Sequence, residues 1–465
     1  MTKKKIHFIG ICGVAMSALA IAFQKKGWKV TGSDVGFFPP ISTHLENNNI
    51  DFYPGWHVDK MIANGDPDLI VVGNVAGSTN PEWQYVQEKK LNYKSYPEVI
   101  AEYFVKENSI VCAGTYGKTT NATLLSFIFR ENNLDPTYMF GGLCQNNMDA
   151  AALTDSKYSI LEGDEYKSSR FDNSPKFKHY SPTHLLLTAI IWDHADVYPT
   201  EESYFKVFGE LVNSMPKKGI IVACTDDKKV AETIKSAPCQ IITYDQNKNA
   251  DYQYSQINST KQGLSFVITN KDKKYKIESQ MLGNYQAANI TGCFAMAQYA
   301  GIPTEKIIAN IKRFRGIKRR LEKRFENDIT IFDDIAHSPT KVQSVLETLR
   351  DIYIGKIITV FEPNTGNRRP ASFPGYDHAF AKADTVIVPF LTKVKIDKND
   401  PEIPADGKKL TEVISKTHKN VLYIEDDKKL IEHILTNTKK DDCVVFLGSH
   451  GFRGMIDQLI SRLSC

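Results

Sequence analysis

The sequence lacks the marks of several large classes of protein. It has no run approaching the ~20 uninterrupted apolar residues of a membrane-spanning helix, so no membrane partner is expected. Basic residues number 58 and acidic residues 54, a surplus too small on this chain to indicate a nucleic-acid partner. The eight cysteines include no CxxC pair and no disulfide-like spacing, which is typical of reduced thiols in a cytoplasm.

What is present is the composition of a soluble globular protein, with 42% hydrophobic and 24% charged residues. A chain of 465 residues, at roughly 150 residues per domain, predicts about three domains. The lysines at 3–5 precede an apolar run and imitate a secretory signal. A strand pattern at 6–9, a glycine turn, an apolar helix and a second strand at 28–31 favour a βαβ unit instead.

Strand and helix patterns alternate along the chain, which predicts α/β domains built on mainly parallel sheets. New strand starts near 109 and 329 place the domains at 1–107, 108–325 and 326–465. The expected strands are 6–9, 28–31, 68–72, 109–113, 158–161, 184–187, 329–332, 356–361, 385–388 and 443–447, with helices near 121–129 and 340–350.

The first glycine turn reads Gly10-Ile11-Cys12-Gly13, between a strand and a helix. Unpaired backbone N–H groups at a helix N-terminus favour a diphosphate, since the helix dipole is positive there. Asp34, at the end of the second strand, is a candidate for contact with a ribose. Because the spacing is not GxGxxG, a nucleotide site and a structural turn both remain open.

The second glycine loop, GTYGKTT at 114–120, follows a buried strand and precedes a helix. Loop amides and Lys118 are expected to hold the β- and γ-phosphates of a nucleotide, while the Thr119 hydroxyl reaches a magnesium ion. The loop is shorter than the usual GxxxxGK[ST] pattern, because Cys112 occupies the position of the first glycine.

Two acidic segments follow strands of the same domain. Glu162-Gly163-Asp164-Glu165 comes directly after the strand at 158–161, and Asp193-His194-Ala195-Asp196 follows the strand at 184–187. Ligands of open α/β sheets collect at the carboxyl ends of strands, so these groups suit magnesium bridging phosphates and a second substrate. Glu162 is the favoured metal ligand because it directly follows its strand.

With these motifs the sequence resembles the Mur ligase superfamily, the ATP-dependent amide ligases of peptidoglycan assembly, along essentially its whole length. The resemblance rests on GICGVAM at 10–16, AGTYGKTT at 113–120, EGDEY at 162–166, WDHADVYP at 192–199, GIKRRLE at 316–322 and DDIAHSPT at 333–340. Within the superfamily it is most similar to the murein peptide ligases. The most similar stretches are 31–34 with Pro39 and Pro40, 73–74 with 80–81, and 171–180.

The resemblance implies an N-terminal Rossmann-like domain that binds UDP-N-acetylmuramate, a central P-loop ATPase-type domain and a C-terminal Rossmann-like domain that carries the amine. The muramate carboxylate attacks the γ-phosphate of ATP, and the amine of a cell-wall peptide then attacks the acyl phosphate. Implied catalytic residues are Lys118, Glu162, His194 and Arg320, and implied magnesium ligands are Thr119, Glu162 and His194. Implied ATP contacts are Gly114, Thr115, Tyr116, Gly117, Lys118, Thr119, Thr120, Asn289, Arg320, Asp334 and His337. Implied UDP-sugar contacts are Gly10, Ile11, Cys12, Gly13, Ser33, Asp34 and Asn74.

Several positions depart from the family pattern. The departures are Tyr116 in the phosphate loop, Ala189 before the DH element, Tyr285-Gln286 beside the expected adenine, Ser338 in the C-terminal element and Asn364 where an arginine is expected to hold the amine, with Arg368 or Arg369 as substitutes. L-Alanine is therefore an alternative amine, and a catalytically impaired nucleotide-sugar-binding homologue is a second alternative. A nicotinamide dehydrogenase is disfavoured by the GKT loop, and both a monomer and a dimer remain open.

Overall fold

In a computed structural model, residues 3–37, 41–169, 172–194, 197–247, 249–392 and 403–464 are described. Pro39, Pro40, Phe171, Ala195 and Asp196, which the sequence analysis used, lie outside these residues. The chain forms two compact units, one of residues 1–257, 265–279 and 285–315, the other of 258–264, 280–284 and 316–465. Within the described residues, no helix has the length and apolar character needed to cross a membrane.

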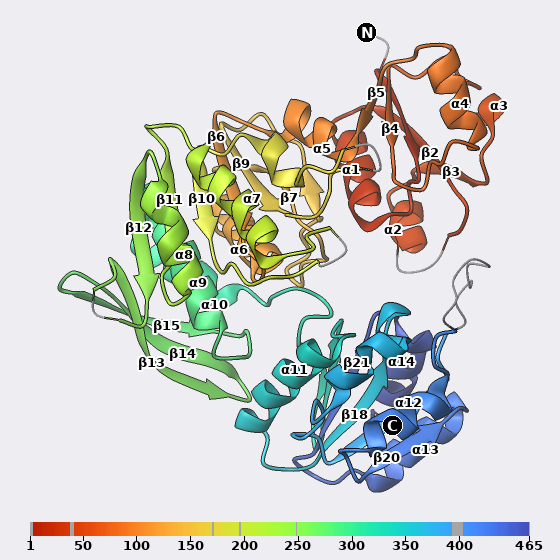
Figure 1. Ribbon diagram of the computed structural model, residues 1–465, viewed down its shortest axis with the longest axis vertical. Helices are drawn as coiled ribbons and strands as arrows, with labels where there is room; N and C mark the ends of the chain where they lie inside the picture. Colours follow the sequence, from red (N-terminus) through yellow and green to blue (C-terminus); the bar gives the residue numbers. More distant parts are fainter. Residues whose placement is uncertain are drawn as a thin grey trace. The chain divides into compact units, whose positions relative to one another are not determined.

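The N-terminal sheet is entirely parallel, with strand order β3-β2-β1-β4-β5 (Figure 1). The predicted βαβ unit is present, because α1 connects the neighbouring strands β1 and β2. The strands are β1 (Lys5–Ile9), β2 (Lys29–Asp34), β3 (Asp51–Pro54), β4 (Leu69–Val72) and β5 (Tyr93–Ser95). The helices are α1 (Val14–Lys25), α2 (Ile41–Asn47), α3 (Val58–Met61), α4 (Pro81–Glu88) and α5 (Tyr96–Val99).

The second sheet has ten strands in the order β15-β14-β13-β12-β11-β10-β6-β9-β7-β8. Its strands are β6 (Asn108–Ala113), β7 (Thr137–Met139), β8 (Ala151–Ala152), β9 (Tyr158–Gly163), β10 (His184–Leu187), β11 (Ile220–Cys224), β12 (Gln240–Asp245), β13 (Tyr252–Thr260), β14 (Gly263–Asn270) and β15 (Lys273–Ser279). Its helices are α6 (Lys118–Glu131), α7 (Glu201–Asn213), α8 (Lys228–Thr233), α9 (Gln286–Tyr299) and α10 (Thr304–Arg313). β6, β10 and β11 are buried almost throughout, as expected for parallel strands covered on both faces.

The end of this sheet departs from the expected alternation of strands and helices. β13, β14 and β15 follow one another with only residues 261–262 and 271–272 between them, and no helix intervenes. Connections of two residues join antiparallel neighbours, so this end of the sheet is built of hairpins. Along β13, buried and more exposed residues alternate over much of the strand, the pattern of a sheet with one covered face.

The C-terminal sheet has the order β16-β17-β21-β18-β19-β20 and is parallel except for β16. Its strands are β16 (Glu322–Glu326), β17 (Thr330–Asp334), β18 (Ile357–Glu362), β19 (Thr385–Pro389), β20 (Val421–Ile424) and β21 (Cys443–Gly448). Its helices are α11 (Pro339–Ile352), α12 (Gly407–Ser415), α13 (Asp427–Asn437) and α14 (Met455–Leu463). The predicted class, three α/β domains on mainly parallel sheets, is confirmed. β16 begins before residue 326, and the exact domain limits stay a prediction.

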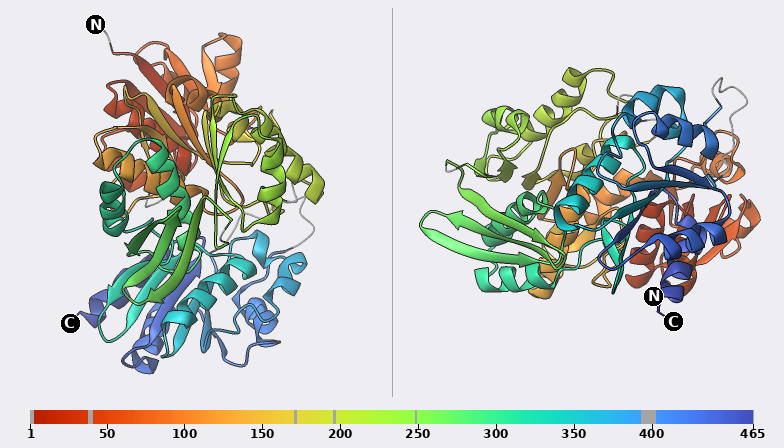
Figure 2. Two further views of the ribbon diagram at one scale, coloured as in Figure 1. Left: turned by 90° about the vertical axis from the view of Figure 1, so that its left-hand side faces the viewer. Right: turned by 90° about the horizontal axis from the view of Figure 1, so that it is seen from below.

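Strand geometry divides the C-terminal domain into two cores, one on each face of its sheet. On β18, Ile357 and Phe361 pack in the first core, whereas Ile358 and Val360 pack in the second. Helices α11 and α12 supply apolar residues to the first core, and α13 and α14 supply the second (Figures 1 and 2). The alternation of this strand therefore decides which helices cover which face.

The N-terminal domain buries one carboxylate, Glu82 of α4, completely. Glu82 accepts hydrogen bonds from the Ser33 hydroxyl at 2.5 Å, the Tyr53 hydroxyl at 2.8 Å and the His57 amide at 2.8 Å. His7 Nε2 lies 3.6 Å from its Oε2 atom. Burial acts to raise the pKa of Glu82, but the nearby His7 ring and the hydrogen bond from Ser33 outweigh it and hold the pKa below its ordinary value. This network fixes the end of β2, where Ser33 lies, against α4.

Replacing Glu82 with Gln is expected to lower the free energy of unfolding of this domain by about 2–3 kcal/mol at neutral pH. A lowered folded pKa gives stability that is fully present above the ordinary value of 4.5 and is lost as the pH falls through the folded value, so the difference should shrink in acid. The measurement is urea unfolding by tryptophan fluorescence in a Trp192→Phe background, where the remaining tryptophans, Trp28, Trp56 and Trp83, report on this domain. A difference that does not change with pH would contradict the assignment.

Candidate functional site

The second glycine loop connects β6 to α6, and its shape requires two of its glycines. Gly114 has φ of +129° and Gly117 has φ of +80°, a region that side chains with a Cβ rarely adopt. A Cβ on Gly114 would collide with the Thr188 hydroxyl, and one on Gly117 would collide with the Asn289 side chain. The backbone of the loop is therefore pressed against β10 on one side and α9 on the other.

Hydrogen bonds fix this loop from the segment that follows β10. The Thr115 amide donates to the Ala189 carbonyl at 2.8 Å, and the Ile191 amide donates to the Thr115 hydroxyl oxygen at 2.9 Å. The Thr188 hydroxyl donates to the Tyr116 carbonyl at 2.5 Å. The amides from Gly117 to residue 120 have no acceptor among the residues that the structure describes, so they are available to phosphate oxygens at the start of α6.

Two of the predicted metal ligands lie together. The Thr119 hydroxyl donates to Glu162 Oε1 at 2.8 Å, and the Gly141 amide donates to Glu162 Oε2 at 2.7 Å. A hydroxyl and a carboxylate at the end of a phosphate loop are oxygen ligands of the kind magnesium prefers. In the described part of the chain, no group of three or more His, Cys, Asp and Glu side chains is close enough to hold a metal by itself. The pair therefore fits a magnesium ion that takes its other ligands from phosphates and water.

The third predicted ligand, His194, has a different partner. Its Nε2 atom lies 3.3 Å from Oε1 of Glu165, a carboxylate with no exposed surface. Lys118 Nζ lies 2.9 Å from Oε1 and 2.7 Å from Oε2 of the same carboxylate. The hydrogen bond with Glu165 raises the pKa of His194, although partial burial acts against it. The sequence predicts Glu165 as part of the acidic segment that supports the site, and the structure places it in contact with both Lys118 and His194.

Two further predicted residues lie beside the phosphate loop. Asn289 is buried on α9 against Gly117, and its side-chain amide donates to Gln286 Oε1 at 3.0 Å. Tyr116 is half exposed. Partial burial, and to a smaller extent the negative charge of Asp193, raise the pKa of its hydroxyl. The structure thus places Asn289 next to the loop itself, while its predicted contact with adenine stays a prediction.

The predicted UDP-sugar residues are largely engaged within the N-terminal domain. The Gly10 and Ile11 amides donate to the Ser33 carbonyl at 2.8 and 3.1 Å, and the Cys12 amide donates to Asp34 Oδ2 at 2.9 Å. The Gly13 amide donates back to the Gly10 carbonyl at 3.4 Å.

The side chains of Ser33 and Asp34 are buried beneath the turn whose amides these two residues accept. The next amides along the chain, those of Val14, Ala15 and Met16 at the start of α1, have no acceptor within the described ranges. Asn74 is exposed. A diphosphate at this turn would therefore meet the first amides of α1 more readily than those of Gly10 to Cys12.

Arg320, Asp334 and His337 belong to the other compact unit. Asp334 is buried and accepts the Leu321 and Ala336 amides at 2.7 Å each, and burial raises its pKa. His337 directs Nδ1 to the Ile335 carbonyl at 2.7 Å, which leaves Nε2 for a ligand, and burial lowers its pKa. Arg320 is exposed and makes no hydrogen bond or ion pair among the described residues. Their predicted contacts with ATP stay predictions.

The structure shows the contacts of two departures from the family pattern, Ala189 and Asn364, and of one candidate substitute, Arg368. Ala189 acts through its backbone carbonyl, so the loop needs no particular side chain there. Asn364 Oδ1 accepts the amide of Asn367 at 3.1 Å and so forms a local turn. Arg368 is buried and donates from Nε and Nη1 to the Ala405 and Thr392 carbonyls at 2.8 and 3.0 Å, and its role as a substitute for the arginine expected at position 364 stays a prediction.

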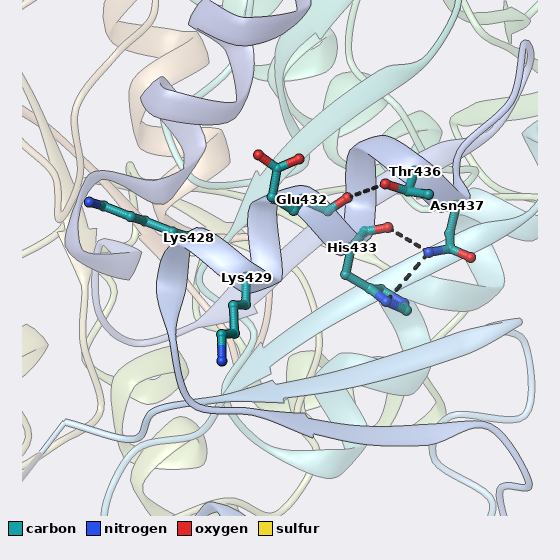
Figure 3. Close-up of a pocket in the computed structure, with 6 residues that line it drawn as sticks. All are labelled: Lys428, Lys429, Glu432, His433, Thr436 and Asn437. Atoms are coloured by element: carbon teal, nitrogen blue, oxygen red, sulfur yellow. Dashed lines mark hydrogen bonds between the residues drawn. The ribbon is translucent and has the colours of Figure 1, made fainter.

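A separate hollow lies on α13 in the C-terminal domain (Figure 3). Its lining consists of residues of this one helix: Lys428, Lys429, Glu432, His433, Thr436 and Asn437. Two polar side chains there bond back to the helix, from the Thr436 hydroxyl to the Glu432 carbonyl and from the Asn437 amide to the His433 carbonyl, each at 2.8 Å. All six lining residues belong to α13, so no second element of the described chain supplies a lining side chain, and we assign this hollow no ligand.

Comparison with known families accounts for nearly the whole chain. Residues 5–106 match the Mur ligase family catalytic domain, residues 112–297 the Mur ligase middle domain, and residues 319–450 the Mur ligase glutamate ligase domain.

Two relatives of different specificity are similarly close. The UDP-N-acetylmuramate–L-alanyl-γ-D-glutamyl-meso-2,6-diaminoheptandioate ligase of Haemophilus influenzae is 31% identical over 371 residues, covering 79% of this chain and 81% of that protein. The UDP-N-acetylmuramate–L-alanine ligase of Clostridium tetani is 30% identical over 453 residues, covering 96% and 95%.

Solved structures give the same picture. A murein peptide ligase from Psychrobacter arcticus has a TM-score of 0.70 at 25% identity, covering 99% of this chain and 98% of that one. The UDP-N-acetylmuramate–alanine ligase of Thermotoga maritima has the same fold, with a TM-score of 0.78 at 19% identity over 99% of both chains. Identity and coverage together establish that the chain belongs to the Mur ligases, a family of ATP-dependent amide ligases.

Proposed function

We propose that this ligase joins the carboxylate of UDP-N-acetylmuramate to the amine of the cell-wall peptide L-Ala-γ-D-Glu-meso-diaminopimelate, as in peptidoglycan recycling. The observation that carries the ligase chemistry is the cluster at the carboxyl ends of β6 and β9. There the phosphate loop, Lys118, Thr119 and Glu162 adjoin the Glu165–His194 pair. These groups match the needs of a reaction that passes twice through crowded negative charge.

In the first step, a carboxylate oxygen of the muramate forms a bond to the γ-phosphorus of ATP while the bond to ADP breaks. The amine nitrogen then attacks the acyl carbon, and inorganic phosphate leaves as the amide forms. Lys118 and the free amides at the start of α6 would stabilise the charge on the transferred phosphoryl group. When bound at Thr119 and Glu162, magnesium would neutralise charge on the phosphates.

The preference for the peptide over L-alanine is supported by the segment after β9. One of the three stretches that most resemble the murein peptide ligases, residues 171–180, lies there, and the segment makes two ion pairs. Lys176 pairs with Asp164 at 2.5 Å, and His179 pairs with Asp172 at 3.0 Å. The second candidate is L-alanine, favoured by the match to the L-alanine ligase of Clostridium tetani, which spans 96% of this chain.

Replacement of Lys118 with Ala is expected to reduce phosphate release by about 10²–10³-fold, because the ammonium group meets the transferred phosphoryl group. The assay contains ATP, magnesium, UDP-N-acetylmuramate and peptide, with release requiring all four. Lys217→Ala, which changes an exposed lysine in the turn before β11, is the matched control and should retain wild-type turnover. Undiminished turnover in Lys118→Ala would overturn the role given to this residue.

A comparison of amines tests the substrate. We expect kcat/KM for L-Ala-γ-D-Glu-meso-diaminopimelate to exceed that for L-alanine by about 100-fold, since a site built for the larger amine gains contacts that L-alanine lacks. The reverse order would assign the protein to de novo synthesis with L-alanine. Absence of phosphate release with every amine, together with calorimetric binding of UDP-N-acetylmuramate, would identify a binding protein without ligase activity.

A further inference from the structure

Glu165 is unusual among the carboxylates of the site because its side chain has no exposed surface, which leaves no side open to a metal or a substrate. Glu162, by comparison, is partly exposed and faces the Thr119 hydroxyl. A buried carboxylate costs several kcal/mol unless cations and hydrogen-bond donors surround it. The groups that contact Glu165 therefore indicate which function offsets the cost of burying its carboxylate.

Those contacts join two functional side chains. Oε1 of Glu165 lies 2.9 Å from Lys118 Nζ and 3.3 Å from His194 Nε2, so one oxygen atom contacts both groups. Lys118 is itself only 14% exposed, so its ammonium group has little water around it. Few other partners therefore compete with Glu165 for the position of this ammonium group.

Residues of the segment before α7 and of α7 itself hold Glu165 in place. The Tyr198 hydroxyl donates to the Glu165 carbonyl at 2.5 Å, and the Tyr204 hydroxyl donates to Oε1 at 3.4 Å. Tyr204 also lies 2.9 Å from the Thr115 hydroxyl in the phosphate loop. Tyr204 thus contacts both the Glu165 carboxylate and the phosphate loop.

We propose that Glu165 is a positioning residue, which holds the Lys118 ammonium group toward the phosphate loop and turns His194 so that only its Nδ1 atom is free for a ligand. This inference rests on the proposed function, in which Lys118 contacts the phosphates of the nucleotide and His194 is a ligand of magnesium. A second partner that fixes the ring of a histidine ligand is a general feature of metal sites. The Lys118 ammonium group and the His194 ring then keep a defined separation before any nucleotide binds.

Glu165→Gln tests the positioning of Lys118, because it preserves the shape of the side chain and removes its charge. We expect the Kd of ADP, measured by calorimetry in EDTA, to rise by about tenfold as the ammonium group loses its charged partner. Glu102→Gln is the matched control, since it makes the same change to a carboxylate that pairs with a lysine, Lys94, at 2.6 Å, away from the phosphate loop. Unchanged or tighter ADP binding in Glu165→Gln would overturn the proposal.

A double-mutant cycle separates positioning from a general effect on folding. If Glu165 acts through Lys118, the Glu165→Gln change should have no further effect on ADP binding in a Lys118→Met background. A loss that persists at full size there would refute the coupling. If Lys118→Met itself leaves ADP binding unchanged, the proposed phosphate site fails, which distinguishes failure of the proposed function from failure of this inference.

The orientation of His194 is tested by the gain in ADP affinity when magnesium is added in place of EDTA. Glu165→Gln should reduce that gain in the wild-type background but not in a His194→Asn background. Glu165→Asp keeps the charge on a side chain shorter by one methylene and should recover part of both effects. Thermal unfolding of each variant shows whether the protein is folded, and Glu165→Asp keeps the test decisive if Glu165→Gln does not fold. Equal losses in both variants would contradict a role based on charge.

Discussion

The parallel pairing of three neighbouring strands is the constraint on which the active region depends. β6 lies between β9 and β10, with Ala113 in register with Gly163 on one side and with Leu187 on the other. Parallel strands present their carboxyl ends at one edge of a sheet, so the three loops that follow must meet there. The phosphate loop, the acidic segment and the histidine segment are therefore brought together by backbone pairing before any side chain is considered.

Much of this arrangement could be predicted from the sequence, because buried parallel strands are continuous apolar runs and the phosphate loop has a distinctive spacing. The contact between Thr119 and Glu162 follows from two strand ends that lie side by side. The place of Glu165 could not be predicted in the same way. Its burial depends on Tyr198 and Tyr204, which come 33 and 39 residues later in the chain, and an acidic loop gives no sign of which carboxylate is covered.

Other differences have equally local causes. Residues 252–279 were expected to continue the alternation of strands and helices, yet β13, β14 and β15 form hairpins, because two-residue turns leave no room for a helix. The Asp34 carboxylate accepts two backbone amides, and its predicted contact with a ribose stays a prediction. Arg368, a candidate for holding the amine, donates from Nε and Nη1 to backbone carbonyls. Asp34 and Arg368 thus both meet a need of the backbone that sequence spacing does not reveal.

The turn after β1 shows what such internal use of polar groups achieves. Because the Ser33 carbonyl and the Asp34 carboxylate already bind its amides, the backbone from Gly10 to Cys12 has its final shape without a ligand. A sugar nucleotide that binds beside this turn does not have to order it, so binding costs little backbone conformational entropy there. If the N-terminal domain binds the sugar nucleotide as proposed, encounter would be limited by diffusion and orientation and not by ordering of this turn.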